Sequence, residues 1–365
     1  MSSTAPRLFI PGPTEVKPEV LAQMARPLIS HRGPEIATIT REIFAGLQRL
    51  FGTTAECFVA SASATGLMEG VARNLVAKKA LVTVCGAFSE RQYQVMIKNG
   101  KAATALRFEP GNPVQPEAVA RALTEDDYDL VTTVHSETST GVLNPVAAIA
   151  EVVRKHPGTF LAVDCVSSLA GAPFEADAWG VDCAFAGTQK CLALPPGLAL
   201  FTVSPRAMDR AATLDDRGHY FDFLNYRKMA ARGQSPATIN IPLMVTLHFQ
   251  LGRIFAEGLE ARFARHEAMA TLVRESLQSY FPVFPPEGFR TPSESVFANP
   301  RGLAIAPIVD AMLRRGKVIG NGYGDLKEKT FRIGHLGDLT PEDLKEVVHD
   351  LREIFRELGI DEEAR

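Results

Sequence analysis

Several features that define other classes of protein are scarce or missing in this 365-residue sequence. Its five cysteines are odd in number and form no C-x-x-C pair, so we expect reduced cysteines and no metal site. The formal net charge is only −3, without a basic stripe, which disfavours nucleic acid as a partner. No apolar run is long enough for a membrane span, and the N-terminus lacks the pattern of a secretory signal. These absences predict a cytoplasmic protein that binds neither membrane nor nucleic acid.

The residues that are abundant indicate a large packed core. Hydrophobic residues make up 46% of the chain and charged residues 22%, and the length suits two domains. Short apolar runs alternate with helical patterns such as residues 146–156. We expect strands at residues 80–86, 129–135, 160–166, 181–187 and 197–203. Strands that are apolar on both faces and joined by helices predict a mostly parallel sheet covered on both sides, which is the α/β class.

The pattern changes after about residue 235. Long helical stretches follow, with a break near Glu257 and Gly258, and then come a mixed stretch and a closing amphipathic helix. Thr340 and Asp343 have the spacing of a capping box, with Pro341 at the first helical position. We therefore divide the chain into residues 1–255, an N-terminal segment with a large domain, and residues 256–365, a smaller α+β domain.

Polar and aromatic side chains follow several of the expected strands at the point where each strand ends. Phe88, Asp164 and Lys190 lie at three such ends, Gln189 directly precedes Lys190, and Thr138 follows a fourth strand. The carboxyl ends of the strands are the ligand-binding edge of an open parallel sheet. Lys190 and Asp164 also interrupt apolar segments, where an unpaired charge is costly. We expect these side chains to converge on one pocket.

The residue types in this pocket suit pyridoxal 5′-phosphate. A lysine can form a Schiff base with an aldehyde, an aspartate can keep a pyridine nitrogen protonated, and an aromatic ring can stack on the cofactor ring. Ser63 and Thr65 precede a helical pattern whose N-terminus would suit a phosphate, although such residues are also common N-caps. Phe88 taken alone is equally compatible with a core position. The sequence contains no G-x-G-x-x-G fingerprint and no phosphate loop ending in G-K-[ST], which disfavours a nucleotide-binding enzyme.

Five longer motifs, in order along nearly the whole chain, resemble those of the class V aminotransferases of fold type I. They are FIPGPTEVKPEVLAQMARPLISHRGPE, HSETSTGVLNP, AVDCVSSLAG, GTQKCLALPPGLA and TFRIGHLGD. The resemblance is to the alanine–glyoxylate and serine–glyoxylate aminotransferase group in particular. It implies pyridoxal 5′-phosphate as cofactor and a large domain with a mostly parallel, seven-stranded sheet, followed by a smaller α+β domain.

The resemblance also implies roles for the matching positions. Lys190 would bond covalently to the cofactor and then move the substrate proton, Asp164 would pair with the ring nitrogen, and Arg332 would bind the substrate carboxylate. The residues implied in cofactor binding are Ser63, Ala64, Thr65, Phe88, Thr138, Asp164, Val166, Gln189, Lys190 and Thr238. Thr238 would reach the phosphate of the other subunit, which implies a homodimer with shared sites. Some family members have tryptophan at the position of Phe88, and glycine is common at that of Ala64.

We therefore expect a ping-pong transamination from a small amino acid, alanine or serine, to a small 2-oxo acid, glyoxylate or pyruvate. One arginine can bind both substrates in turn only if both are α-carboxylates. A phosphoserine or aspartate aminotransferase is the main alternative, because Lys327, Lys329 and His335 lie near Arg332 in the sequence and could meet a second anionic group.

Two further hypotheses are disfavoured. A cysteine desulfurase-type lyase would have histidines where this chain has Phe88 and Gln189, and no cysteine follows Cys191 here. A non-catalytic ligand-binding relative would not need the Schiff-base lysine, which is intact. His31 and Arg32 lie in a family-like motif, where either an active-site role or an interface role would explain them.

Overall fold

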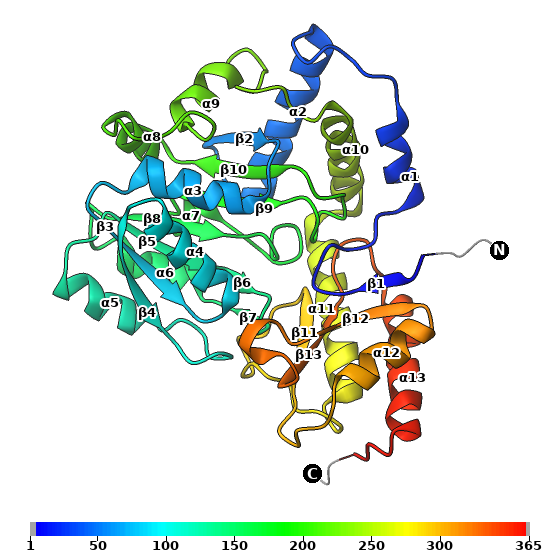
Figure 1. The fold of residues 1–365 in the computed structure, drawn as a ribbon. Helices are drawn as coiled ribbons and strands as arrows, with labels where there is room; N and C mark the ends of the chain where they lie inside the picture. The colour runs from blue at the N-terminus through cyan, green and yellow to red at the C-terminus, as the bar shows by residue number, and fades with distance from the viewer. Residues whose placement is uncertain (1–4, 363–365) are drawn as a thin grey trace.

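The computed structural model describes residues 5–362, which form a seven-stranded sheet, a four-stranded sheet and a two-stranded ribbon with their covering helices (Figure 1). The helices are α1 (Pro18–Leu21), η1 (Ala22–Ala25), α2 (Pro34–Phe51), α3 (Ala64–Leu75), α4 (Ala87–Lys98), α5 (Pro116–Glu125), α6 (Val146–Val153), α7 (Ala176–Trp179), α8 (Pro205–Ala212), α9 (Phe223–Ala230), α10 (Ile241–Glu257), α11 (Leu259–Leu277), α12 (Ala306–Arg314), η2 (Gly324–Leu326) and α13 (Pro341–Glu357). The strands are β1 (Arg7–Phe9), β2 (Glu56–Ala60), β3 (Lys79–Val84), β4 (Ala102–Arg107), β5 (Leu130–Val134), β6 (Ser136–Glu137), β7 (Val142–Leu143), β8 (Phe160–Asp164), β9 (Cys183–Gly187), β10 (Ala199–Val203), β11 (Glu294–Ala298), β12 (Lys317–Asn321) and β13 (Thr330–Gly334).

The large sheet has the strand order β2-β10-β9-β8-β5-β3-β4. Strand β10 is antiparallel to both of its neighbours, and the pairings of β3, β4, β5, β8 and β9 are parallel. All residues of β5, β9 and β10 are buried, as expected for strands covered on both faces. The mostly parallel, seven-stranded α/β architecture predicted from the sequence is therefore confirmed.

Helices cover both faces of the large sheet. Helices α2, α5, α6, α7 and α10 share one apolar core with the strands, and α3, α4, α8 and α9 share another on the opposite face. Side chains alternate between these cores along a strand: Cys57 and Val59 contribute to the first, and Phe58 and Ala60 to the second. Because both faces are sealed, a ligand can reach this sheet only at its edges.

The small sheet joins the two ends of the chain. Its order is β1-β12-β13-β11, and β1 pairs with β12 in parallel, so the N-terminal strand lies beside strands from the C-terminal part (Figure 1). Helices α11, α12 and α13 share its apolar core. Gly334 allows the close approach of the N-terminal segment, because a Cβ there would lie 2.0 Å from the backbone oxygen of Ile10. The proposed division at residue 255 remains a prediction, and residues 7–9 pair with the second sheet.

Two local signals in the sequence correspond to features of the structure. Helix α10 ends at Glu257, and Gly258, with a φ of 86°, turns the chain into α11, which begins at the next residue. Helix α13 begins with the expected capping box, in which Thr340 Oγ1 accepts a hydrogen bond from the amide of Asp343. These two signals mark the starts of α11 and α13, which pack against the small sheet.

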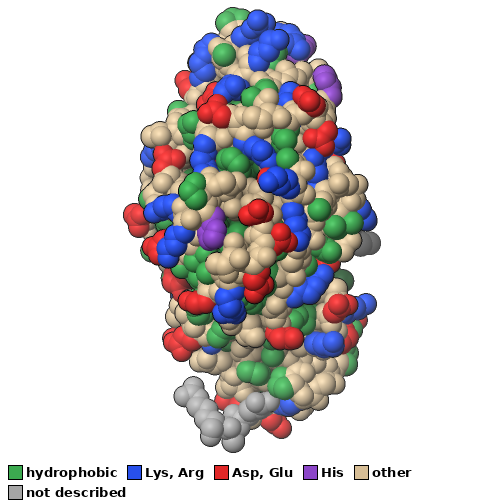
Figure 2. Space-filling view, turned by 90° about the vertical axis from the view of Figure 1, so that its left-hand side faces the viewer, with side chains coloured by type: hydrophobic (Ala, Val, Ile, Leu, Met, Phe, Trp, Pro, Cys, Tyr) green, Lys and Arg blue, Asp and Glu red, His purple; other side chains and the backbone are tan. Residues whose placement is uncertain are grey.

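The surface carries charges of both signs. Lysine and arginine are interspersed with aspartate and glutamate over the face drawn in Figure 2. Among residues 5–362, no helix has the length and apolar character needed to cross a membrane. The five cysteines are all buried and unpaired with one another.

Candidate active site

A cavity of about 360 Å³ lies at the carboxyl ends of the parallel strands. Segments that follow β1, β2, β3, β5, β8 and β9 all contribute to its walls. Nine of the eleven residues predicted for the site line it: Ser63, Ala64, Thr65, Phe88, Thr138, Asp164, Val166, Gln189 and Lys190. The structure therefore brings these separate strand ends together at one edge of the sheet, where open α/β sheets bind their ligands.

Lys190 lies three residues after the end of β9 and is only 8% exposed. Its Nζ donates a hydrogen bond to the backbone oxygen of Pro11. Gly12 makes this approach possible, because a Cβ on Gly12 would lie 2.5 Å from Lys190 Cδ. Burial lowers the pKa of the Lys190 amine, while the charge of Glu294 opposes that shift. A buried amine with a lowered pKa can act as a nucleophile and as a base.

Asp164 is the last residue of β8, at the floor of the cavity, and is 3% exposed. Its Oδ1 accepts a hydrogen bond from the amide of Val166 at 2.9 Å, and Oδ2 has only a long contact of 3.5 Å with Gln92 Nε2. Burial raises the pKa of this carboxyl to about 6. One side of the carboxylate is thus held in place, and the other is open to a hydrogen-bond donor in the cavity.

The N-terminus of α3 opens into the same cavity. Ser63 is the N-cap, but its side chain makes no capping hydrogen bond, and Ser63, Ala64 and Thr65 all line the cavity. Ser61 is turned away, because its Oγ accepts a hydrogen bond from the amide of Asn240 at 2.8 Å. An uncapped helix N-terminus with free amides suits an anion such as phosphate.

Phe88 forms one wall of the cavity and stacks on Tyr323. The two rings are 5.3 Å apart between centroids, with 18° between their planes. Arg91, one helical turn after Phe88, also lines the cavity and donates a hydrogen bond from Nη2 to Tyr323 Oη at 3.2 Å. Tyr323, which precedes η2, therefore links the rim of the cavity to the small sheet. Phe88 was predicted from the sequence, whereas Arg91 and Tyr323 were not.

Glu137 holds the start of α4, and with it Phe88, in position. Its carboxylate is fully buried and accepts hydrogen bonds from Ser89 N and Ser89 Oγ, both at 2.9 Å, and from Ser139 Oγ at 2.6 Å. The amide of Phe88 also donates to it, at 3.2 Å. A carboxylate at a helix N-terminus is favourable, so Glu137 caps α4 rather than lining the cavity.

Arg332 lies beside the cavity, on β13. Its Nη1 donates to the backbone oxygen of Thr138 at 3.2 Å, and its Nε donates to that of Asn321 at 3.0 Å. Its Cζ lies 5.5 Å from the centroid of the Tyr323 ring. Burial lowers the pKa of the guanidinium, and the nearby charge of Glu294 opposes this shift. These contacts orient Arg332 and leave part of its guanidinium available to a ligand.

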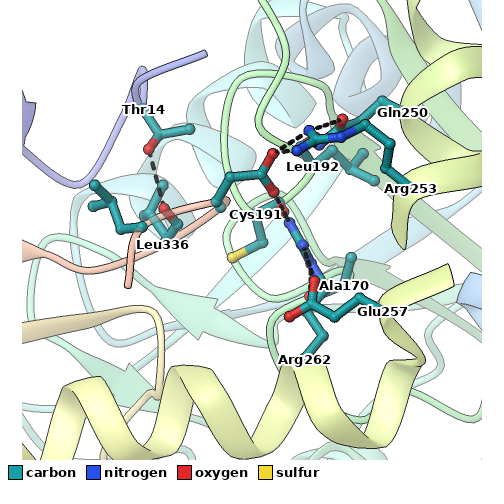
Figure 3. A network of polar contacts seen from close by, with 12 residues as sticks. Thr14, Ala170, Cys191, Leu192, Gln250, Arg253, Glu257, Arg262 and Leu336 are labelled. Carbon is teal, nitrogen blue, oxygen red and sulfur yellow. Dashed lines mark hydrogen bonds and ion pairs between the residues drawn. The ribbon is translucent and has the colours of Figure 1, made fainter. Parts of the chain in front are cut away.

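A network of buried polar groups supports the loop that carries Lys190 (Figure 3). Arg262 of α11 is 1% exposed and donates to the backbone oxygens of Cys191 at 2.6 Å and of Ala170 at 3.2 Å. Ion pairs join it to Glu257 at 2.7 Å and to Asp338 at 3.0 Å. Arg262 therefore ties the residue after Lys190 to α11 and to the segment that follows β13.

Helix α10 holds the same loop from another side. Gln250 Nε2 donates to the backbone oxygen of Leu192 at 3.1 Å, and Arg253 Nη1 forms an ion pair with Asp338 at 2.7 Å. The thiol of Cys191 donates to the backbone oxygen of Ser167, and burial raises its pKa to about 11. Cys191 is thus a protonated packing residue next to the lysine.

Other candidates from the sequence lie outside the cavity. Thr238 is exposed, two residues before the Asn240 that bonds to Ser61. His31 and Arg32 are exposed, and Arg32 Nη1 donates to Gln234 Oε1 at 3.1 Å. The lysines proposed for a second anionic group, at positions 327 and 329, are exposed, and the histidine at position 335 is fully buried against Ser295.

Glu294, on β11, was not identified from the sequence. It is fully buried beside Lys190 and Arg332, whose charges act on it, and burial raises the pKa of its carboxyl to about 8. A polar residue in a strand-like run is usually solvent-facing, and Glu294 lies in none of the quoted motifs, so nothing in the sequence indicated it.

The chain is similar to proteins of known sequence and structure over nearly its whole length. Residues 8–283 match the profile of the family described as Aminotransferase class-V. A serine–glyoxylate aminotransferase of Methylorubrum extorquens is 33% identical over 91% of this chain and 86% of its own. An L-aspartate–glyoxylate aminotransferase of Paracoccus denitrificans is 34% identical, with 93% and 88% covered. The crystal structure of an alanine–glyoxylate aminotransferase from Nostoc sp. has a TM-score of 0.92 at 27% identity, and 98% and 97% of the two chains are covered.

Proposed function

The chain belongs to the class V aminotransferase family, and from this premise we propose that it transfers an amino group from alanine or serine to glyoxylate or pyruvate, with pyridoxal 5′-phosphate as cofactor. The observation that carries the proposal is the convergence of Lys190, Asp164 and the open N-terminus of α3 on one cavity. A lysine, a carboxylate and an anion site are the three groups that this cofactor requires.

The residues present fit the cofactor. The uncapped turn at Ser63–Thr65 offers amides to the phosphate, and Gln189 lies at the same wall. Asp164 Oδ2 has room for a further donor, and the Gln92 Oε1 atom behind it has no hydrogen-bond partner among the described residues. The Phe88 ring, Val166 and Thr138 border the space between these groups. Pyridoxal 5′-phosphate would supply an aldehyde for covalent attachment and a ring that accepts electrons from the substrate carbon.

Each residue of the site then has a defined task. The Lys190 amine would hold the cofactor covalently, and as a free base it would move the proton at the substrate α-carbon. The Asp164 carboxylate would hold the cofactor ring in its protonated form. Arg332 orients the α-carboxylate of the donor and then that of the acceptor, so the two substrates bind in turn at one position.

We also propose that the protein is a cytoplasmic homodimer in which each active site receives a residue from the other subunit. Thr238 does not line the cavity of its own chain, and it is exposed, so it is available to the phosphate site of a second copy. Sedimentation of the purified chain at dilute concentration distinguishes a dimer from a monomer.

The proposal is tested with single-donor assays. Purified protein is incubated with pyridoxal 5′-phosphate, glyoxylate and one amino acid at a time, and the glycine formed is measured by mass spectrometry. We expect alanine and serine to give the highest kcat/KM. No glycine from any α-amino acid would refute the proposed reaction.

One observation favours aspartate as a second candidate donor. Arg91 places a second guanidinium on the cavity wall, bonded to the hydroxyl of the same Tyr323 whose ring Arg332 contacts. Two arginines that contact one tyrosine could bind the two carboxylates of a dicarboxylic amino acid.

Arg91→Gln tests this second candidate. If Arg91 binds the second carboxylate, we expect kcat/KM for aspartate to fall by about 10- to 100-fold, because a charge-assisted hydrogen bond contributes about 1.5–3 kcal/mol. The value for alanine should change little. Arg121→Gln, at an exposed position on α5, is the control. An equal loss for both donors would exclude Arg91 as the selective group.

A further inference from the structure

Glu294 is an unusual group, because its buried carboxylate has no hydrogen-bond partner among residues 5–362. The residue is 0% exposed, and within the described part of the chain neither Oε1 nor Oε2 has a hydrogen-bond partner. Removing a carboxylate from water without compensating hydrogen bonds is costly. A buried polar group left unpaired in a folded protein therefore requires an explanation, and a functional site is a common one.

The sheet register places Glu294 on the face of the small sheet that meets the large domain. Glu294 pairs with Gly334, and Val296 pairs with Arg332, so all four residues lie on one face of the antiparallel pair. Val296 packs toward the large domain, since its Cγ2 would lie 2.7 Å from a Cβ on Gly141. Glu294 and Arg332 are therefore diagonal neighbours that face the cavity side.

Lys190 approaches the same place from the large domain. Gly334, opposite Glu294, is in contact with the backbone of Ile10, and Lys190 Nζ bonds to the backbone oxygen of Pro11. Gly334, on the same face as Glu294, and Lys190 thus both contact the short Ile10–Pro11 segment. The charges of Lys190 and Arg332 both act on the Glu294 carboxylate, so it lies near the group proposed to bind the substrate carboxylate and the group proposed to do the chemistry.

The charged groups around Glu294 come from four elements. Lys190 after β9, Arg332 on β13 and Arg274 on α11 are cationic, and Glu137 on β6 is anionic. Arg274 Nη2 donates to the backbone oxygens of Thr291 and Glu294, so that contact does not involve the carboxylate.

The remaining neighbours do not neutralise the Glu294 carboxylate either. The carboxylate of Glu137 is occupied by the start of α4. His335 lies on the other face of β11, bonded to Ser295, and burial keeps its pKa well below the ordinary value, so it is neutral. The charge of Glu294 is therefore balanced by Lys190 and Arg332, and burial brings its own pKa to about 8.

A substrate carboxylate at Arg332 would add a second anion beside the first. Two carboxylates that share one buried cationic site cannot both remain ionised at low cost. We propose that, at alkaline pH where Glu294 is ionised, it takes up a proton when a substrate carboxylate binds to Arg332, so that the net charge around Lys190 stays constant. This inference rests on the proposed function, which places the substrate carboxylate at Arg332.

The step balances simply. One carboxylate enters with one negative charge, one proton enters from the solvent, and an O–H bond forms on Glu294. No bond breaks in the protein, and no electron is transferred. Without this proton, the additional anion would raise the pKa of Lys190 and leave less of the neutral amine that must act as a base. Glu294 therefore acts through Lys190 and is a positioning residue.

The test measures proton uptake when the cofactor-loaded protein binds propionate, which has the carboxylate of alanine but no amine to transfer. Calorimetric titrations at about pH 8.5 in two buffers of different ionisation enthalpy give the number of protons taken up. Any proton taken up by the cofactor itself is read from its visible absorption and subtracted. After this subtraction, we expect the wild type to take up about 0.5 proton per site or more, and Glu294→Gln to take up about 0.1 proton or less.

Controls separate this inference from the proposed function. Ser295→Ala, on the opposite face of the same strand, should show the wild-type uptake, and Arg332→Gln should lose propionate binding. Equal uptake in the wild type and in Glu294→Gln would overturn the inference and leave the proposed function intact. Failure of the wild type to bind propionate would overturn both.

A measurement on the wild type alone covers the case in which Glu294→Gln does not fold. Near pH 6 Glu294 is already protonated, so the uptake should be close to zero there and should grow toward about pH 8.5. An uptake that does not change over this range would overturn the inference.

Discussion

At the scale of single residues, the end of β8 buries the Asp164 carboxylate and orients it toward the cavity. The apolar run of β8 buries the carboxylate, the amide of Val166 holds one oxygen, and the other oxygen remains open. The charge is costly in this position unless a ligand pairs with it. The lysine and the aspartate could be predicted from sequence because each interrupts an apolar run.

Asp164→Asn tests this role. The amide keeps the size of the side chain but cannot hold a positive charge on the cofactor ring. We expect kcat to fall by about 10- to 100-fold, the equivalent of about 1.5–3 kcal/mol for a hydrogen bond to a charged group. Steady-state rates with the best donor measure this loss. Asp209→Asn, exposed on α8, should leave the rate unchanged, and an unchanged rate in Asp164→Asn would contradict the assignment.

The buried Glu294 carboxyl should make the stability of the folded protein depend on pH. Its pKa is raised from 4.5 to about 8 in the folded protein, so the folded state holds this proton more tightly than the unfolded state. Its contribution to stability is fully present below about pH 4.5 and is lost as the pH rises through about 8.

Glu294→Gln removes this titration. For each protein we compare the free energy of unfolding at about pH 5.5 and about pH 8.5. We expect the value for Glu294→Gln minus that for the wild type to be larger at pH 8.5 than at pH 5.5, by about 1 kcal/mol or more. Thermal unfolding of both proteins at the two pH values provides the comparison. A difference between variant and wild type that is the same at both pH values would show that Glu294 does not titrate in this range.

At the scale of elements, the site depends on how α10 and α11 hold the loop after β9. Arg262 alone bonds to two backbone oxygens and to two carboxylates, from four separate segments (Figure 3). A lysine could not replace this pattern, because the guanidinium offers several donors in a fixed plane.

Arg262→Gln should therefore destabilise the protein strongly. The substitution leaves Asp338, whose side chain is 10% exposed, with fewer cationic partners, and breaking a buried ion pair costs about 3–5 kcal/mol. Denaturant unfolding measures the loss. Arg356→Gln removes an exposed pair with Glu353 on α13, which contributes about 0–1 kcal/mol, and serves as the matched control. Similar small losses in both variants would show that the Arg262 network is not a support of the loop.

Three features of the sheets were not predicted from the sequence, because each depends on where the strand lies in the folded molecule. Strand β4 is a half-exposed edge strand, so its apolar pattern is weak. Strand β1 has three residues, and its partner β12 lies in the C-terminal part of the chain, so no local pattern indicates the pairing. The antiparallel direction of β10 also depends on tertiary connections rather than on composition.

At the scale of the whole molecule, the cavity residues of the large domain can be predicted from the sequence. The residues that the small sheet brings to the site are harder to predict. Lys190, Asp164 and Phe88 follow strands of one sheet, and the rule for parallel sheets places them together. Tyr323 and Glu294 reach the site only because the small sheet packs against the large domain. Their roles depend on a surface that the sequence does not reveal.

The absorption spectrum of the purified protein tests the central claim most directly. The protein is loaded with pyridoxal 5′-phosphate, and its spectrum is recorded before and after addition of L-alanine and then of glyoxylate. Lys190→Ala and Lys98→Ala, an exposed position on α4, are measured in parallel. We predict a visible band in the wild type and in Lys98→Ala that alanine bleaches and glyoxylate restores, and no such band in Lys190→Ala. The same band in Lys190→Ala, or no band in the wild type, would contradict the account.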